Sequence, residues 1–128
     1  MNNTICDIGV ARKIGTYSDA IEVPANARWL FTAGTPGLAI EGTPPAGITA
    51  QAEMAWRHVN HMLQRADMTI KDVVKVTQYL MRAADIPAYA AVRERALAGA
   101  RPASTLLVVP ALVRPDFLLE IEVIAAKA

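Results

Sequence analysis

The sequence predicts one α+β domain over residues 1–128, in which a mixed β-sheet carries two helices on a single face. Two periodic segments are the main evidence. Apolar residues recur three and four apart between Thr49 and Ala66, and they alternate with polar residues from Val73 to Met81. The first spacing is typical of an amphipathic helix and the second of a strand. No Pro-, Gly- or Ser-rich linker divides the chain, so we expect a single domain with the element order βββαβαββ.

The first third of the chain has the composition of β-strands. Residues 18–23 and 28–33 read as strands, the second of them rich in aromatic and apolar side chains, and Pro24 to Ala27 form a turn between them. This arrangement predicts a hairpin. Residues 38–40 predict a short third strand, which a Pro-rich loop at residues 42–47 ends.

The ends of both helices carry recognisable signals. Thr49 is expected to cap the first helix, and Asp85 the second, since short polar side chains can accept hydrogen bonds from first-turn amides. The second helix is expected to run to about Ala98, where Gly99 ends it. Residues 105–109 and 118–125 complete the sheet as strands.

Composition predicts self-association. Hydrophobic residues make up 53% of the chain and the mean hydropathy is +0.25, which is high for so small a protein. Two helices on one face leave the other sheet face uncovered. Copies of the same chain are the simplest cover, and closed symmetry is the usual form of such assembly.

Charge and cysteine usage exclude several classes of partner. The 13 basic residues are scattered among 12 acidic ones, so we expect no nucleic acid as a partner. Neither an export signal nor an apolar run of membrane-spanning length is visible, so we expect no membrane association. Cys6 is the single cysteine, which fits a reducing, cytoplasmic location and predicts an inert thiol.

The last strand carries the first candidate for chemistry. Glu120 and Glu122 are two residues apart, so both point to one face of the sheet. One interpretation is a solvated edge or a structural ion pair. The other is a cleft between subunits, where burial raises the pKa of a carboxylate that holds or deprotonates water. Spacing alone leaves both open.

Other polar residues give weaker signals. His58 and His61 are three apart on the first helix, but no third ligand accompanies them, so a solvated face is favoured over a metal site. Tyr17 stands at a strand entrance, where its phenol either lines a pocket or bonds locally. The familiar nucleotide-binding, serine-hydrolase and zinc-protease motifs are absent from the sequence.

Six segments in register across nearly the whole chain resemble one known family. They are residues 14–18, 30–34, 51–66, 73–77, 101–105 and 119–125. Together they are similar to the reactive-intermediate (imine and enamine) deaminase family, also called YjgF-like or L-PSP endoribonuclease. Each piece is short, but the combination is specific.

The resemblance implies a chorismate-mutase-like homotrimer with clefts between neighbouring subunits. Its active members hydrolyse small enamine and imine substrates to keto acids and ammonia, with no cofactor and no metal. It implies that Glu120 positions the attacking water. Tyr17, Ala33, Gly34 and Thr35 match positions that line the substrate pocket.

The sequence departs from the family where the substrate is held. Where the family has Pro-Ala-Arg-Ser, this chain has Ser104 followed by Thr105, so a hydroxyl stands in place of the guanidinium that clamps a carboxylate. Ala90 replaces a pocket asparagine of the active members. Arg101 is a conceivable substitute, although three extended residues displace it by ~10 Å and turn it to the opposite face.

Three functions follow from these residues. The leading hypothesis is a deaminase-like hydrolase of altered specificity, with Ser104 and Thr105 beside the substrate. The alternative is a non-catalytic trimer that binds a small ligand, in which Glu120 pairs with Arg28 or Lys75. Ribonuclease activity, suggested by one family name, fits poorly because a basic groove is not visible.

Overall fold

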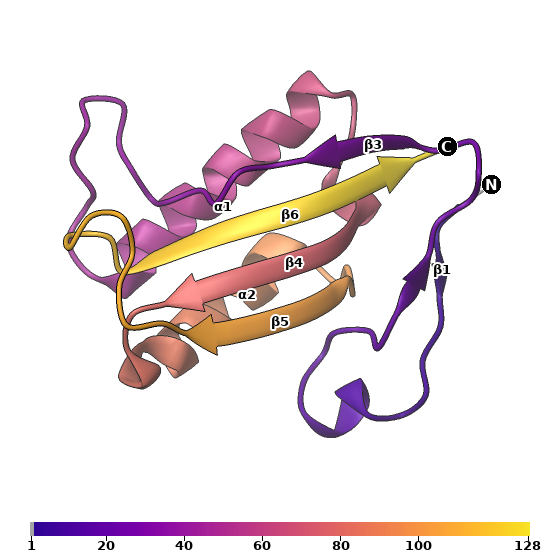
Figure 1. Cartoon of the computed structure of the whole chain (residues 1–128), viewed down its shortest axis with the longest axis horizontal. Coiled ribbons are helices and arrows are strands. Elements are labelled where there is room, and N and C mark those ends of the chain that lie inside the picture. Colours follow the sequence, from indigo (N-terminus) through magenta and orange to yellow (C-terminus); the bar gives the residue numbers. More distant parts are fainter. Residues whose placement is uncertain (1) are drawn as a thin grey trace.

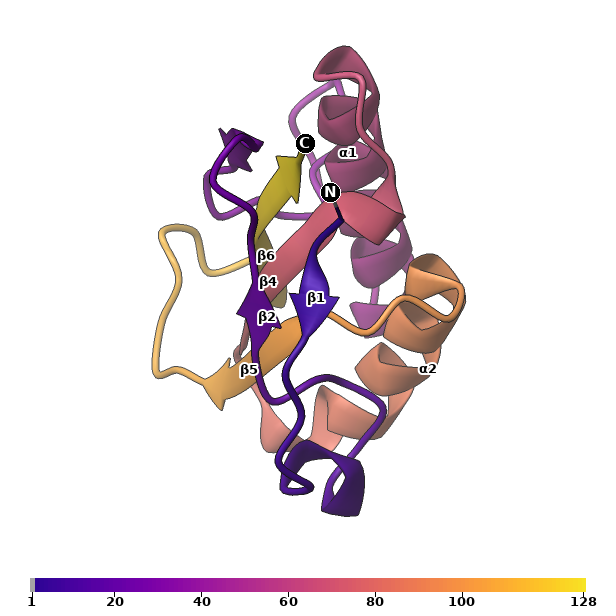
Figure 2. The ribbon, with the colours of Figure 1, turned by 90° about the vertical axis from the view of Figure 1, so that its right-hand side faces the viewer.

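Two helices cover one face of a four-stranded sheet, and the other face is open (Figure 1). The computed structural model describes residues 2–128. The strands lie in the order β3-β6-β4-β5, with β4 and β5 parallel and the other pairs antiparallel. The bounds are β3 Arg28–Phe31, β4 Val73–Leu80, β5 Ala103–Val108 and β6 Leu119–Lys127, with helices α1 Ile48–Arg65 and α2 Ile86–Leu97. Figure 2 shows both helices on the same side of the sheet.

The core lies between the helices and one face of the sheet. On β4, the side chains of Val76, Gln78 and Leu80 are buried toward the helices, whereas Lys75 and Thr77 alternate with them on the open face. Helix α1 contributes the apolar stripe expected from its spacing, namely Ala52, Ala55, Trp56, Val59 and Leu63. The predicted α+β architecture with both helices on one face is therefore confirmed.

The predicted hairpin in the first third is wrong. β2 (Ile21–Glu22) pairs with β1 (Thr4–Ile5) in a separate two-stranded sheet, which Figure 2 shows in front of the main strands. β3 pairs instead with β6. The start of the expected first strand is engaged elsewhere, because Ser18 forms a parallel bridge with Ala103 of β5. The order βββαβαββ is nevertheless observed, since β1 stands in for the third expected strand.

Three local expectations are also corrected. Residues 38–40 form no strand; they lie in the loop before α1, and the side chain of Ile40 is fully exposed. Helix α1 begins at Ile48 with Gly47, not Thr49, at the N-cap position. Asp85 does occupy the N-cap of α2, but its carboxylate accepts from Arg82 at 3.0 Å and makes no capping bond.

The open face carries large apolar side chains. Trp29 and Phe31 stack with ring centroids 6.0 Å apart, and they are 53% and 68% exposed. Leu107 on β5 adds a third large apolar group, 42% exposed. Burying one such side chain contributes about 1.5–3 kcal/mol, so this face favours a partner surface. Within residues 2–128, no helix is both long and apolar enough to cross a bilayer.

Candidate functional site

The first group of candidate residues lies on the open face, where β6 begins. Thr35 and Ile121 exchange two backbone hydrogen bonds of 2.8 and 3.0 Å, which places residues 33–35 beside the start of β6. The carboxylate of Glu120 lies directly over Gly34, so that a β-carbon at this glycine would overlap Glu120 Oε1. Ala33, Gly34, Thr35 and Glu120 are thus neighbours, and Gly34 leaves the room that the carboxylate occupies.

Glu120 has no cationic partner within 4.0 Å among residues 2–128. The structural ion pair considered for it is wrong, because Lys75 donates to Thr105 Oγ1 at 2.6 Å and Arg28 donates to the carbonyl of Ala66 at 3.1 Å. Burial, and then repulsion from the Glu122 carboxylate, raises the pKa of Glu120 above the ordinary glutamate value. An unpaired, partly desolvated carboxylate of this kind can accept a proton from water.

Glu122 lies on the same face but in a different environment. The hydroxyl of Tyr79 donates to Glu122 Oε1 at 2.6 Å, and this bond together with burial raises the pKa of the Tyr79 phenol. Tyr79 is also the cross-strand neighbour of Glu120. One carboxylate of the pair is therefore anchored by a phenol and the other is left free.

The second group lies at the edge formed by α2 and β5, on the helix side of the sheet. Ser104 is in register with Val76, and its hydroxyl accepts from Gln78 Nε2 at 3.0 Å, so it faces the helices. Ala90 is half-buried on α2. A single chain therefore does not bring Ser104 and Glu120 into one pocket, because the sheet separates them.

Tyr17 belongs to this second group by its flanking contacts. Thr16 donates to Glu94 of α2 at 2.6 Å, and Ser18 bridges Ala103 of β5. These two contacts hold the half-buried Tyr17 at the α2–β5 edge. Thr105, in contrast, lies in register with Thr77 on the open face, where Lys75 binds it.

Gln78, which was not among the residues predicted from the sequence, organises the second group. Its Oε1 accepts from Tyr89 at 2.7 Å and from Arg93 at 3.4 Å. Its Nε2 donates to Ser104 Oγ and to the carbonyl of Thr105, both at 3.0 Å. Burial raises the pKa of the Tyr89 phenol, which keeps it a hydrogen-bond donor. The sequence did contain an indication of this role, because Gln78 is a polar residue at one of the alternating positions of β4 that are buried.

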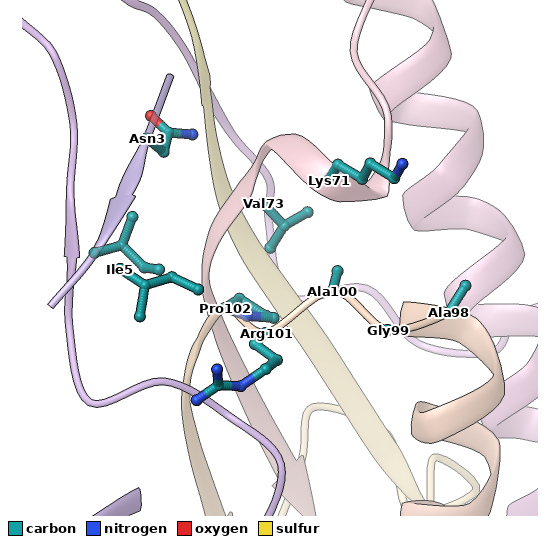
Figure 3. A pocket seen from close by; sticks show the side chains of 10 residues that line it. Asn3, Ile5, Lys71, Val73, Ala98, Gly99, Ala100, Arg101 and Pro102 are labelled. Carbon is teal, nitrogen blue, oxygen red and sulfur yellow. The ribbon is translucent and has the colours of Figure 1, made fainter. Parts of the chain in front are cut away.

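Two other features lie outside these groups, although Arg101 also donates to the carbonyl of Tyr17 at 3.5 Å. A cavity of about 350 Å³ lies between β1–β2 and the connection from α2 to β5 (Figure 3). Arg101 lines it and pairs with Asp7 at 2.7 Å, so it does not substitute for the absent arginine at position 104. His58 Nε2 lies 2.7 Å from the carbonyl of Leu38, a contact that ties α1 to the preceding loop.

Comparison with known proteins establishes the family. Residues 10–127 match the sequence model of the family described as Endoribonuclease L-PSP. The chain belongs to this L-PSP family. The family is also known as Rid or YjgF and includes imine and enamine deaminases.

Solved structures of other members agree with the fold of this L-PSP protein. It is similar to YyfB from Yersinia pestis, a protein of the conserved Rid family, with 27% identity over 99% of this chain and 100% of that chain, and a TM-score of 0.86. RidA from the Antarctic bacterium Psychrobacter sp. PAMC 21119 is 28% identical over 89% of this chain and 90% of its own, with a TM-score of 0.74. A Mycobacterium tuberculosis member of the YjgF/YER057c/UK114 family is 26% identical over 98% and 100% of the two chains, with a TM-score of 0.70.

Proposed function

We propose that this protein is a cytoplasmic, homotrimeric hydrolase that converts a reactive enamine, imine or related small metabolite to its carbonyl compound and ammonia, with a specificity altered at Ser104. The observation that carries the proposal is Glu120. It is a partly buried carboxylate with a raised pKa and no cationic partner, in contact with the backbone of Gly34. Belonging to the L-PSP family makes this chemistry the first to consider.

In the proposed reaction Glu120 accepts a hydrogen bond from water and takes its proton as the water attacks. The water oxygen forms a bond to the imine carbon. Glu120 returns its proton to the nitrogen, and the hydroxyl group of the tetrahedral intermediate gives the nitrogen a second proton as the carbonyl double bond forms. The carbon–nitrogen bond breaks in this step and releases ammonia. An enamine reacts in the same way after a proton has moved from its nitrogen to its β-carbon, which makes it an imine. The raised pKa of Glu120 suits this role, because a base whose pKa approaches the working pH both accepts and returns the proton. The step requires neither a cofactor nor a metal.

A site between subunits is supported by the positions of the two groups. Glu120 and Gly34 are on the open face, whereas Ser104, Ala90 and Tyr17 are at the α2–β5 edge on the helix side. One small substrate cannot contact both groups of the same chain. A neighbouring copy that covers the exposed Trp29 and Phe31 would present its own edge to the open face.

The test is ammonia release by the purified protein from a panel of imines and enamines generated in solution, including 2-aminoacrylate. We expect turnover of at least one substrate and its loss in Glu120→Ala. We also expect Ser104→Arg to move the preference toward 2-aminoacrylate. Vigorous wild-type turnover of 2-aminoacrylate that Ser104→Arg does not increase would contradict the altered specificity.

The same panel separates the rival functions. Ligand binding without turnover of any imine would favour the non-catalytic binding protein, for which the missing arginine at position 104 is the supporting observation. Cleavage of RNA by nuclease-free protein, abolished by Glu120→Ala, would favour the ribonuclease instead.

A further inference from the structure

Arg93 differs from every other arginine of the described chain. It is half-buried, and it lies more than 4.0 Å from every carboxylate within residues 2–128. The other arginines are either exposed or, like Arg114 with Asp116 at 2.6 Å, paired with an acid. A guanidinium that has lost part of its hydration without gaining an anion is an available binding group.

The position of the Arg93 side chain is held from two sides. Its Cζ lies 5.8 Å from the centroid of the Tyr89 ring, and its Nη1 is 3.4 Å from Gln78 Oε1. Tyr89 also donates to that oxygen, at 2.7 Å, so the oxygen receives only a long second bond from Arg93. The ring and the amide therefore orient the guanidinium while most of its N–H groups remain without a protein acceptor.

The surroundings of Arg93 provide a second donor. Ser104 Oγ accepts from Gln78 Nε2, so its own hydrogen remains free to donate. Arg93 and Ser104 thus contact opposite ends of one carboxamide, that of Gln78. Ala90 precedes Arg93 by three residues, lies on the same side of α2, and carries no group that would compete for these donors.

We infer that Arg93 and Ser104 together bind the carboxylate of a small substrate at the α2–β5 edge. The inference rests on the proposed function and deepens it, because it assigns the carboxylate of a small substrate to residues other than the family's arginine at position 104. The guanidinium that binds the substrate carboxylate then extends from α2 instead of β5. This difference changes where the substrate lies and accounts for an altered specificity. A charged fork and a hydroxyl donor, both held by the carboxamide of Gln78, are groups that donate hydrogen bonds to a carboxylate.

The probe for binding is 2-oxobutyrate, a stable keto acid of the product class, and its neutral counterpart is 2-oxobutanamide. Calorimetry with the wild-type protein should show binding of the acid and at least tenfold weaker binding of the amide. Arg93→Gln should weaken binding of the acid tenfold or more and remove this discrimination. Arg93→Lys should give an intermediate result, since it keeps a charge but not the fork.

The matched control is Arg95→Gln. Arg95 is two residues further along α2, exposed, and 3.7 Å from Glu53, so its loss should leave binding unchanged. Adding Ser104→Arg to Arg93→Gln should restore part of the affinity for the acid. Equal binding of the acid by the wild-type, Arg93→Gln and Arg93→Lys proteins, each shown to be folded by circular dichroism, would overturn the inference.

Failure of this inference is distinguishable from failure of the proposed function. Ammonia release that depends on Glu120 but is as fast from imines without a carboxylate would contradict carboxylate binding by Arg93 and Ser104. It would still support the proposed hydrolase. Binding of 2-oxobutyrate that depends on Arg93, without turnover of any imine, would support carboxylate binding by Arg93 and contradict the proposed hydrolase.

Discussion

The two groups of candidate residues are opposites in charge and in position. The open face presents Glu120, a carboxylate without a cation, and the α2–β5 edge presents Arg93, a cation without a carboxylate. Each would cost folding free energy if it served structure alone, because partly desolvated charges are stabilised by partners. The comparison favours the proposal that each is one half of a site, which a second copy of the chain would complete.

The largest expected effect is on the turnover number, and it distinguishes the two carboxylates of β6, Glu120 and Glu122. Glu120→Gln should lower the turnover number by a factor of about 10²–10⁴, the usual contribution of a general base. Glu122→Gln is the matched control, because Glu122 is on the same strand and face but is bound by Tyr79 at 2.6 Å. It should retain most of the turnover in a steady-state ammonia assay. Equal losses in both variants would break the distinction between a free and an anchored carboxylate.

The next effect concerns the apolar part of the open face. Phe31→Glu removes an exposed aromatic group and places a charge where a neighbouring chain is expected, so association should weaken by about a hundredfold. Ile40→Glu also replaces an apolar side chain by a charged one, at a fully exposed residue of the loop before α1 that belongs to no strand of the sheet. Sedimentation analysis should show the trimer lost only in Phe31→Glu. A trimer that survives this substitution would place the subunit contact elsewhere.

A smaller effect contrasts two glycines. A β-carbon at Gly34 would meet the mobile end of Glu120, whereas one at Gly37 would meet the backbone oxygen of Gln51. Gly34→Ala should therefore cost activity, by roughly tenfold, with little loss of stability. Gly37→Ala should instead lower the free energy of unfolding by about 1–3 kcal/mol. Thermal unfolding and the ammonia assay should be measured on both variants. A loss of stability in Gly34→Ala together with a loss of activity alone in Gly37→Ala would contradict the placement of Glu120.

The smallest expected effect is a movement of the pH profile. Because the pKa of Glu120 is raised, activity that needs its carboxylate should fall as the pH drops through that raised value. Glu122→Gln removes one of the two causes of the raised pKa, so the acid limb of the profile should move to lower pH. The movement should be partial, because burial is the larger cause. An acid limb that moves to higher pH would reverse the sign of this electrostatic argument.

Sequence reasoning could predict the long elements and not the short ones. The period of three and four in residues 51–66 and the alternation in β4 are repeated often enough to specify a helix and a strand. β1 and β2 are two residues each, so no period exists to be detected, and their pairing depends on contacts distant in sequence. The turn at residues 24–27 joins two apolar segments, but these segments do not pair with each other.

The candidate site was predicted in part. The pleat of β6 placed Glu120 and Glu122 on one face, and Gly34 and Thr35 lie beside Glu120. The side of the sheet that Ser104 faces was not evident, because residues 104–108 of β5 do not alternate cleanly. The role proposed for Arg93 rests on the absence of a neighbouring acid among residues 2–128, which only the three-dimensional arrangement shows.

The central claim, that two chains build one site, can be tested by mixing two impaired variants. Glu120→Gln keeps the α2–β5 edge intact, and Arg93→Gln keeps the open face intact. Trimers assembled at random from equal amounts should recover roughly a quarter of the wild-type activity, because that share of interfaces combines two intact halves. Mixed trimers that form, as shown by native mass spectrometry, yet recover no activity beyond that of the separate variants would contradict the claim.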